Sequence, residues 1–167
     1  MIDIEPVTRA ERARLVDIFL ELEAYYFADQ AASQSEIEAY LTDSLFAEHS
    51  GVRVVAAYTG GVIVGFATYS ILYPSPKLSG QMFMKDLFVA ASARGQKVGQ
   101  ALMRYLAKDA FTKGCRRLDW TAERTNPGAG RFYQSIGASQ VAEKEYYRFS
   151  DEALAAFASG RDQIPQH

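Results

Sequence analysis

The fold of this chain is decided by residues 84–100, which read Met-Lys-Asp-Leu-Phe-Val-Ala-Ala-Ser-Ala-Arg-Gly-Gln-Lys-Val-Gly-Gln. The apolar part, 84–89, predicts the end of a strand, and a helical pattern begins near Val98. Between them lies a short loop with glycines, 94–100. A strand, a glycine loop and a helix N-terminus together present converging backbone N–H groups and the positive end of a helix dipole. The stretch therefore predicts a cradle for a phosphate or pyrophosphate.

Length and composition predict one domain, 1–167, because 49 % of the 167 residues are apolar and suffice for one substantial core. The N-terminus has no basic region before an apolar segment, and no apolar stretch approaches the roughly 20 residues that cross a bilayer. We therefore expect a soluble, cytoplasmic protein without membrane contact. The lone Cys115 and the distant His49 and His167 lack metal-ligand spacing, so we expect no metal.

Charge is unevenly distributed along the chain. The net charge is −2, yet residues 1–50 hold 11 acidic residues against three arginines, and residues 51–167 hold 15 basic against nine acidic residues. Solvated helix faces commonly produce such asymmetry, and it also suits a protein that meets an anion with one part and a cation with another. A net charge near zero without a basic stripe argues against nucleic acid as a partner.

Hydrophobic periodicity predicts an α+β fold with a mixed, mostly antiparallel central sheet flanked by helices. Thr8 and Glu11 have the spacing of a helix capping box, and Gly60-Gly61 is typical of a two-residue hairpin turn. The predicted strands are 2–7, 52–59, 62–72, 81–89, 117–122 and 141–149, and the predicted helices begin at Thr8, at Ser33 or Ser35, at Val98 and at Pro127.

Two motifs lie about 30 residues apart: Arg-Gly-Gln-Lys-Val-Gly at 94–99 and Asn-Pro-Gly-Ala-Gly-Arg-Phe-Tyr-Gln-Ser-Ile-Gly-Ala at 126–138. With the order of elements, they resemble the GCN5-related N-acetyltransferase superfamily over nearly the whole chain. The corresponding motifs there are Gln/Arg-x-x-Gly-x-Gly/Ala and Asn-x-x-Ala-x-x-Phe-Tyr-x-x-x-Gly-Phe/Ala. Lys97 stands where the family usually has glycine, and a lysine fits there if its φ angle is negative.

The resemblance implies acetyl-CoA as cosubstrate, without a metal, and the primary amine of a small molecule as acceptor. The pyrophosphate would lie on the loop N–H groups, assisted by Arg94 and Lys97, and the pantetheine arm would add to the exposed strand edge. Asn126 would hydrogen-bond the arm on its other side. The implied cofactor-binding residues are Leu87, Phe88, Val89, Arg94, Gly95, Gln96, Lys97, Val98, Gly99, Gln100, Asn126 and Ala129.

The implied reaction passes through a tetrahedral intermediate whose oxygen is negative. A backbone N–H at Phe88 or Val89 would donate to that oxygen. The departing thiolate needs a proton, and the resemblance implies Tyr133 as the general acid. We expect direct attack by the amine in a ternary complex, with Cys115 as buried filler rather than an acyl carrier.

The attacking amine must first lose a proton. An alkylammonium of pKa near 10.4 is neutral to only about one part in a thousand at pH 7, a cost of roughly 4 kcal/mol. Asp86 is the first candidate base, acting directly or through water, and Asp119 and Glu123 are weaker candidates. Acidic residues of the first helix and the loop after it are candidates for the entrance of the amine: Asp17, Glu21, Glu23 and Asp29.

Within the superfamily, residues 85–95 and the Tyr25-Tyr26 region after the first helix look most like diamine and thialysine acetyltransferases. Three other functions stay open: an acyl-CoA-binding regulatory module without turnover, an acetyltransferase of protein N-termini or aminoglycosides, and a nucleotide-binding protein. The last lacks a Gly-Lys-Ser/Thr ending in its loop. The family commonly dimerises through C-terminal strands, for which Tyr146, Tyr147 and Phe149 are candidates.

Overall fold

A computed structural model describes residues 1–161 of the chain, and His167 lies outside this range. Residues 1–125 form one compact unit, and the residues from Asn126 onward form a second. The expectation of one undivided domain therefore stays a prediction. In the described part of the chain, no helix is long and apolar enough to cross a membrane.

The first unit contains a five-stranded sheet in the order β1-β2-β3-β4-β5. The pairs β1–β2, β2–β3 and β3–β4 are antiparallel, and β5 runs parallel to β4. The predicted mixed, mostly antiparallel sheet is confirmed. The strands are β1 (Asp3–Pro6), β2 (Arg53–Thr59), β3 (Val62–Ser75), β4 (Ser79–Val89) and β5 (Cys115–Asp119).

Local sequence signals explain several of these elements. Gly60 and Gly61 have φ angles of 57° and 80°, as the turn of the β2–β3 hairpin requires. Thr8 and Glu11 form the predicted capping box, but the helix that they begin is a 3₁₀ helix, Arg9–Leu15, which leads into α1 (Val16–Phe27). Tyr25 and Tyr26 thus lie inside α1 and not after it.

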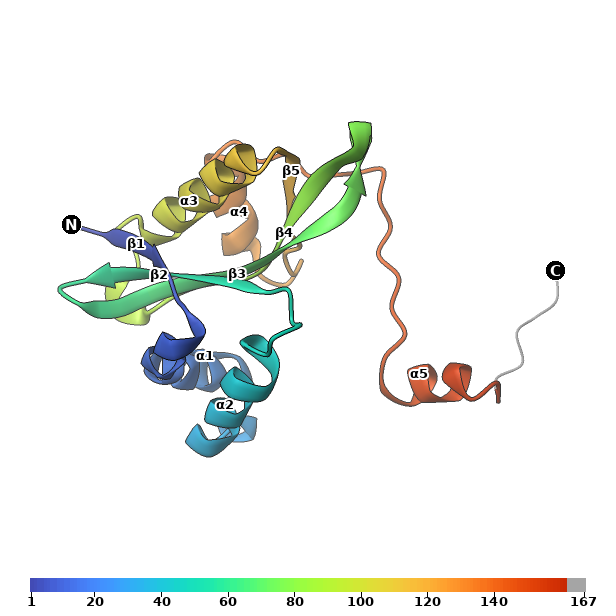
Figure 1. Cartoon of the computed structure of the whole chain (residues 1–167), viewed down its shortest axis with the longest axis horizontal. Coiled ribbons are helices and arrows are strands. Elements are labelled where there is room, and N and C mark those ends of the chain that lie inside the picture. The colour runs from blue at the N-terminus through green and yellow to red at the C-terminus, as the bar shows by residue number, and fades with distance from the viewer. Residues whose placement is uncertain (162–167) are drawn as a thin grey trace. The chain divides into compact units, whose positions relative to one another are not determined.

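Helices cover both faces of the sheet in this unit. Figure 1 shows α1 and α2 (Gln34–Tyr40) on one face and α3 (Val98–Thr112) on the other. On the α1 face, the Phe19 ring stacks on Phe66 with the ring centroids 4.8 Å apart. On the α3 face, Leu102 and Leu106 are completely buried. The sheet is therefore a layer between two apolar cores.

Gly65 on β3 allows the start of α3 to pack closely on the sheet. A Cβ atom at this position would lie 2.9 Å from Cγ1 of Val98 and 3.1 Å from the carbonyl oxygen of Phe88. Val98 is the first residue of α3, so this contact also sets the place of the loop that precedes the helix.

The second unit contains α4 (Pro127–Ser135) and α5 (Asp151–Ala158). The predicted strand 141–149 is wrong, because the structure has no strand in that segment. A strand is stable only where its N–H and C=O groups pair with a neighbour. The side chains of Tyr146 and Tyr147 remain 70 % and 84 % exposed.

Candidate active site

One edge of β4 is open along residues 84–89. This strand pairs with β3 as far as Val89, but its pairing with β5 covers only Gly80 to Phe83. Within residues 1–161, the last part of β4 therefore has no strand on the β5 side. An extended amide chain can bind such an edge by adding as a further strand.

Hydrogen-bond alternation shows which amides face this open edge. Ala90 donates its N–H to the carbonyl oxygen of Val64 at 2.8 Å, and the N–H groups of residues two apart in a strand point the same way. The N–H of Phe88 therefore points toward β3, and that of Val89 points to the open edge. Of the two predicted oxyanion donors, only Val89 has the required orientation.

The loop before α3 provides the predicted N–H groups. Ala101 donates to the carbonyl oxygen of Lys97 at 3.1 Å in the first turn of the helix. The N–H groups of Val98, Gly99 and Gln100 therefore have no acceptor within the helix. They are available to an anion at the positive end of the helix dipole.

Lys97 does not have the negative φ angle that we expected. Its φ is 64°, in the left-handed region, and it is the N-cap of α3. A side chain in this conformation costs about 1 kcal/mol relative to glycine, because its Cβ approaches the following carbonyl. The left-handed backbone gives a physical reason for the family's usual glycine at this place.

Two other side chains of the loop have local partners. Arg94 donates from Nε to the carbonyl oxygen of Val89 at 3.3 Å, and its guanidinium lies 4.9 Å from the centre of the Tyr25 ring. Gln96 donates to the carbonyl oxygen of Ser92 at 3.2 Å. Arg94 thus connects the end of α1 to the end of β4, beside the loop amides.

A β-bulge at Lys85 sets the direction of Asp86. Thr68 pairs with Asp86 and Tyr69 pairs with Met84, so Lys85 is an extra residue in β4. Without the bulge, in a regular strand, positions 84 and 86 would face the same side of the sheet. With it, Met84 lies beside Tyr69, which bonds to α3, and Asp86 faces α1 and α2.

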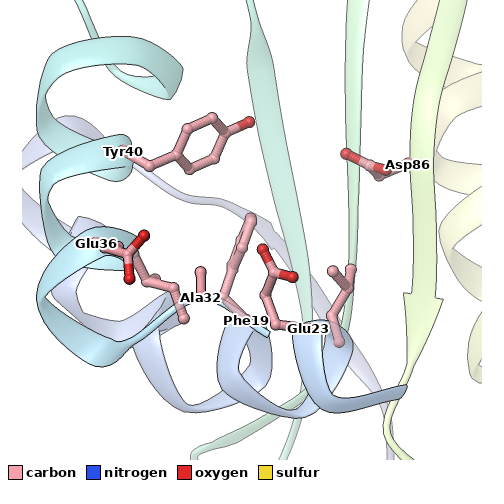
Figure 2. A pocket seen from close by; sticks show the side chains of 8 residues that line it. Phe19, Glu23, Ala32, Glu36, Tyr40 and Asp86 are labelled. Atoms are coloured by element: carbon pink, nitrogen blue, oxygen red, sulfur yellow. The ribbon is translucent and has the colours of Figure 1, made fainter. Parts of the chain in front are cut away.

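Asp86 is one wall of a cavity of about 360 Å³ between β4 and the two helices. Figure 2 shows its carboxylate and the hydroxyl of Tyr40 directed toward each other, with the Glu23 carboxylate rising between them. Among the described residues that line the cavity, none is lysine or arginine, so the three carboxylates make it negative. The lining residues are Phe19, Leu22, Glu23, Ala32, Glu36, Ile37, Tyr40 and Asp86.

The neighbours of these groups determine their protonation. Burial, and then the charge of Asp86, raises the pKa of Tyr40, so this phenol stays a hydrogen-bond donor at neutral pH. Burial also raises the pKa of Tyr26, with smaller contributions from Tyr25 and Asp86. Hydrogen bonds from Ser33, its backbone N–H first, lower the pKa of Glu36 and keep this carboxyl ionised. The cavity therefore suits an ammonium group.

Of the four acidic residues expected at the entrance, only Glu23 lines the cavity; Asp17, Glu21 and Asp29 do not. Sequence reasoning missed Glu36 and Tyr40. The sequence signal that could have found them was their spacing, since residues four apart on a helix share a face and Glu36 and Tyr40 therefore point the same way.

The weaker base candidates lie outside the cavity. Asp119, the last residue of β5, accepts a hydrogen bond from Nε2 of Gln81 at 2.6 Å. Glu123 is exposed in the loop that follows. Cys115 is buried at the start of β5, beside Gly80. Asp86 is therefore the candidate base that faces the negative cavity.

Tyr133 and Asn126 belong to the second unit. Tyr133 is half-buried on α4, with its ring centroid 5.3 Å from that of Phe132. Asn126 caps α4, because its side-chain oxygen accepts the N–H of Ala129 at 3.3 Å. The amide NH₂ of Asn126 is not used by this cap. The roles of these residues toward acetyl-CoA stay predictions.

An open central strand, followed by a loop of free N–H groups at a helix start, defines a class of α+β proteins suited to an extended anionic cofactor. Residues 15–138 match the Acetyltransferase (GNAT) family, and the chain belongs to this family. The resemblance seen in the two motifs is thereby confirmed.

Curated relatives of the chain include N-acetyltransferases of different kinds. Thialysine N-epsilon-acetyltransferase of Mus musculus is 29 % identical over 107 residues, which are 59 % of each protein, so the chain spans well under two thirds of that relative. Aminoglycoside N(6')-acetyltransferase type 1 of Klebsiella aerogenes is 31 % identical over 117 residues, 69 % of this chain and 76 % of the relative.

Solved structures share the fold. An integron cassette protein from the mobile metagenome of V. cholerae is 55 % identical, with a TM-score of 0.92 over 94 % of this chain and 97 % of its own. An aminoglycoside N-acetyltransferase in complex with CoA has a TM-score of 0.67 at 20 % identity, over 89 % of this chain and 95 % of its own. At that identity, the likeness concerns the fold alone.

Proposed function

We propose that this protein transfers an acetyl group from acetyl-CoA to the primary amine of a small molecule, by direct attack in a ternary complex. The observation that carries the proposal is the bulge at Lys85. It places the Asp86 carboxylate in a negative cavity, one residue before the open-edge amide of Leu87 and three before that of Val89. Membership of the GNAT family supports the same reaction.

The cofactor side of the proposal uses backbone groups. The pyrophosphate of acetyl-CoA binds the N–H groups from Gly95 to Gln100, and the pantetheine arm pairs with the open edge at 87–89. The N–H of Val89 donates to the thioester oxygen as this oxygen becomes negative. Lys97 supplies a positive charge within the loop. Asn126 and Ala129, at the start of α4, also bind acetyl-CoA.

The amine side uses the cavity. Glu23 and Glu36 attract the cationic substrate, and Asp86 accepts the proton that the ammonium group must lose. The C–N bond then forms and the C–S bond breaks. Tyr133 gives its proton to the departing thiolate, and the second proton that the nitrogen loses after attack passes through solvent to restore the phenol, so that N-acetylamine and free thiol are the products.

An acetylation screen tests this function. We expect release of CoA thiol with polyamines, lysine analogues or aminoglycosides, and a weaker reaction with peptides. Relatives named for thialysine and for an aminoglycoside support substrates with more than one cationic group. Binding of acetyl-CoA without thiol release from any amine would contradict the enzyme and indicate a regulatory binding module.

Glu23→Gln is expected to raise KM for a multiply charged amine about tenfold, because a carboxylate beside an ammonium in a half-enclosed cavity contributes about 1.4 kcal/mol. The KM for acetyl-CoA should not change. Asp17→Asn, which removes an exposed carboxylate of the same helix outside the cavity, is the control. Steady-state kinetics with each substrate varied make the measurement. Equal effects of both changes would contradict a local role for Glu23.

We also propose that the protein is a cytoplasmic homodimer. Apolar side chains crowd the exposed surface of residues 141–157, and Phe149 stacks on Phe157 with centroids 4.7 Å apart. A second copy provides a cover for such a surface. We expect sedimentation equilibrium to show a dimer and Tyr147→Asp to weaken it at least tenfold, with the exposed Phe111→Asp as control. A monomer at every concentration would contradict this proposal.

A further inference from the structure

We propose that Thr68 is the positioning residue of Asp86: its hydroxyl holds one carboxylate oxygen and leaves the other to the amine. The inference rests on the proposed function, in which Asp86 accepts the proton. Thr68 lies on β3 directly opposite Asp86 and is only 2 % exposed.

The two residues form a reciprocal pair of hydrogen bonds. Asp86 donates its backbone N–H to Oγ1 of Thr68 at 3.1 Å, and Thr68 donates its hydroxyl to Oδ2 of Asp86 at 3.1 Å. The direction of both bonds is determined. An N–H can only donate, so the hydroxyl must accept there, and its single hydrogen is left for the carboxylate.

This direction restricts the Asp86 side chain. Rotation about its Cβ–Cγ bond would break the bond to Oδ2, so Oδ2 stays with Thr68 and Oδ1 becomes the oxygen presented to substrate. The carboxylate points across the cavity toward Tyr40 in Figure 2. Thr68 therefore acts on the reaction through Asp86 and not by contact with the amine.

The bulge explains why a hydroxyl is needed at this place. An extra residue at Lys85 interrupts the regular ladder between β3 and β4, and the amide of Asp86 bonds to a side chain instead. A buried amide without a partner destabilises the fold, and a valine would leave this amide in that state. Threonine thus both completes the bulge and orients the carboxylate.

Three variants test the proposal on the full chain. Thr68→Val keeps the shape and removes the hydroxyl, and we expect kcat for amine acetylation to fall by about 10- to 100-fold, since misplaced reacting groups lose rates of this order. The KM for acetyl-CoA should change less than about twofold. Thr68→Ser keeps the hydroxyl, so we expect about a third or more of wild-type kcat. A serine variant as impaired as the valine variant would overturn the proposal.

Asp86→Asn provides the third variant, through a double-mutant cycle. If Thr68 acts through Asp86, Thr68→Val should cause no further loss of kcat in the Asp86→Asn background. A merely structural role would give losses that multiply, and that result would also overturn the proposal. Where the valine variant does not fold, Thr68→Ala replaces it in the same cycle.

Amide hydrogen exchange separates this inference from the proposed function. The Asp86 amide should exchange at least tenfold faster in Thr68→Val than in wild type and in Thr68→Ser, with the global stability of each variant measured in parallel. This readout needs no substrate. Absent turnover in the wild type would contradict the proposed function, whereas unchanged exchange in the valine variant would contradict the positioning role.

Discussion

Asp86→Asn is expected to lower kcat/KM for the amine about 10²- to 10³-fold, within the roughly 10²- to 10⁴-fold that a general base contributes. Asparagine keeps the size of the side chain and can still accept the hydroxyl of Thr68, so the fold should be unchanged. It cannot accept a proton from the ammonium group. Acetyl-CoA affinity, measured by calorimetry, should change less than about twofold, because the proposed function assigns cofactor binding to the loop amides and not to Asp86.

The pH dependence of this variant gives a second check. An alkylammonium loses its proton near pH 10.4, so the neutral amine increases as pH rises. A base is needed less when the amine is already neutral, and the difference between wild type and variant should narrow from pH 7 toward pH 10.

Asp119→Asn is the matched control, because it removes a carboxylate from the end of β5 that does not line the cavity. It should leave kcat/KM within about threefold of wild type. A large loss of kcat/KM in this control, with no loss in Asp86→Asn, would indicate that Asp119 on β5 is the base instead of Asp86.

Tyr133→Phe is expected to lower kcat about 10²- to 10³-fold with little change in acetyl-CoA affinity, because in the proposed mechanism the phenol acts only when the thiolate departs. A thiol has a pKa near 8.5, so the leaving group needs a proton less at higher pH. The loss should therefore be smaller at pH 9 than at pH 7. Thiol release under saturating amine makes the measurement.

The matched control for this change is Tyr146→Phe, which removes the hydroxyl of an exposed tyrosine in the same unit. Its kcat should equal that of wild type. Unchanged turnover in Tyr133→Phe would remove Tyr133 from the role of general acid, and weak acetyl-CoA binding would indicate a structural role instead.

Elements with strong local signals could be predicted from the sequence. The helix predicted to begin at Pro127 does begin there, because Asn126 caps it and Pro127 fits its first turn. The Gly60-Gly61 hairpin also formed where predicted. In the candidate site, the loop at 94–100 could be predicted from the sequence. The direction of its N–H groups depends only on the end of one strand, one turn and the start of one helix, which are consecutive in the chain.

Elements that depend on distant partners could not be predicted. The pattern at 141–149 is apolar enough for a strand, but a strand requires an edge to pair with, and the structure has no strand in this segment. Glu36 joins Asp86 in one cavity although 50 positions separate them in the chain, and no local pattern reports that proximity.

The sequence by itself determined the family, the order of the strands from β1 to β5 and the place of the glycine loop before α3, since each depends on side chains close together in the chain. Only the tertiary structure decided the direction of Asp86. The bulge at Lys85 is defined by pairing between β3 and β4, and its polar partner Thr68 lies 18 residues away. The physical reason is that strand register is a relation between two segments, and it determines which face of the sheet a side chain occupies.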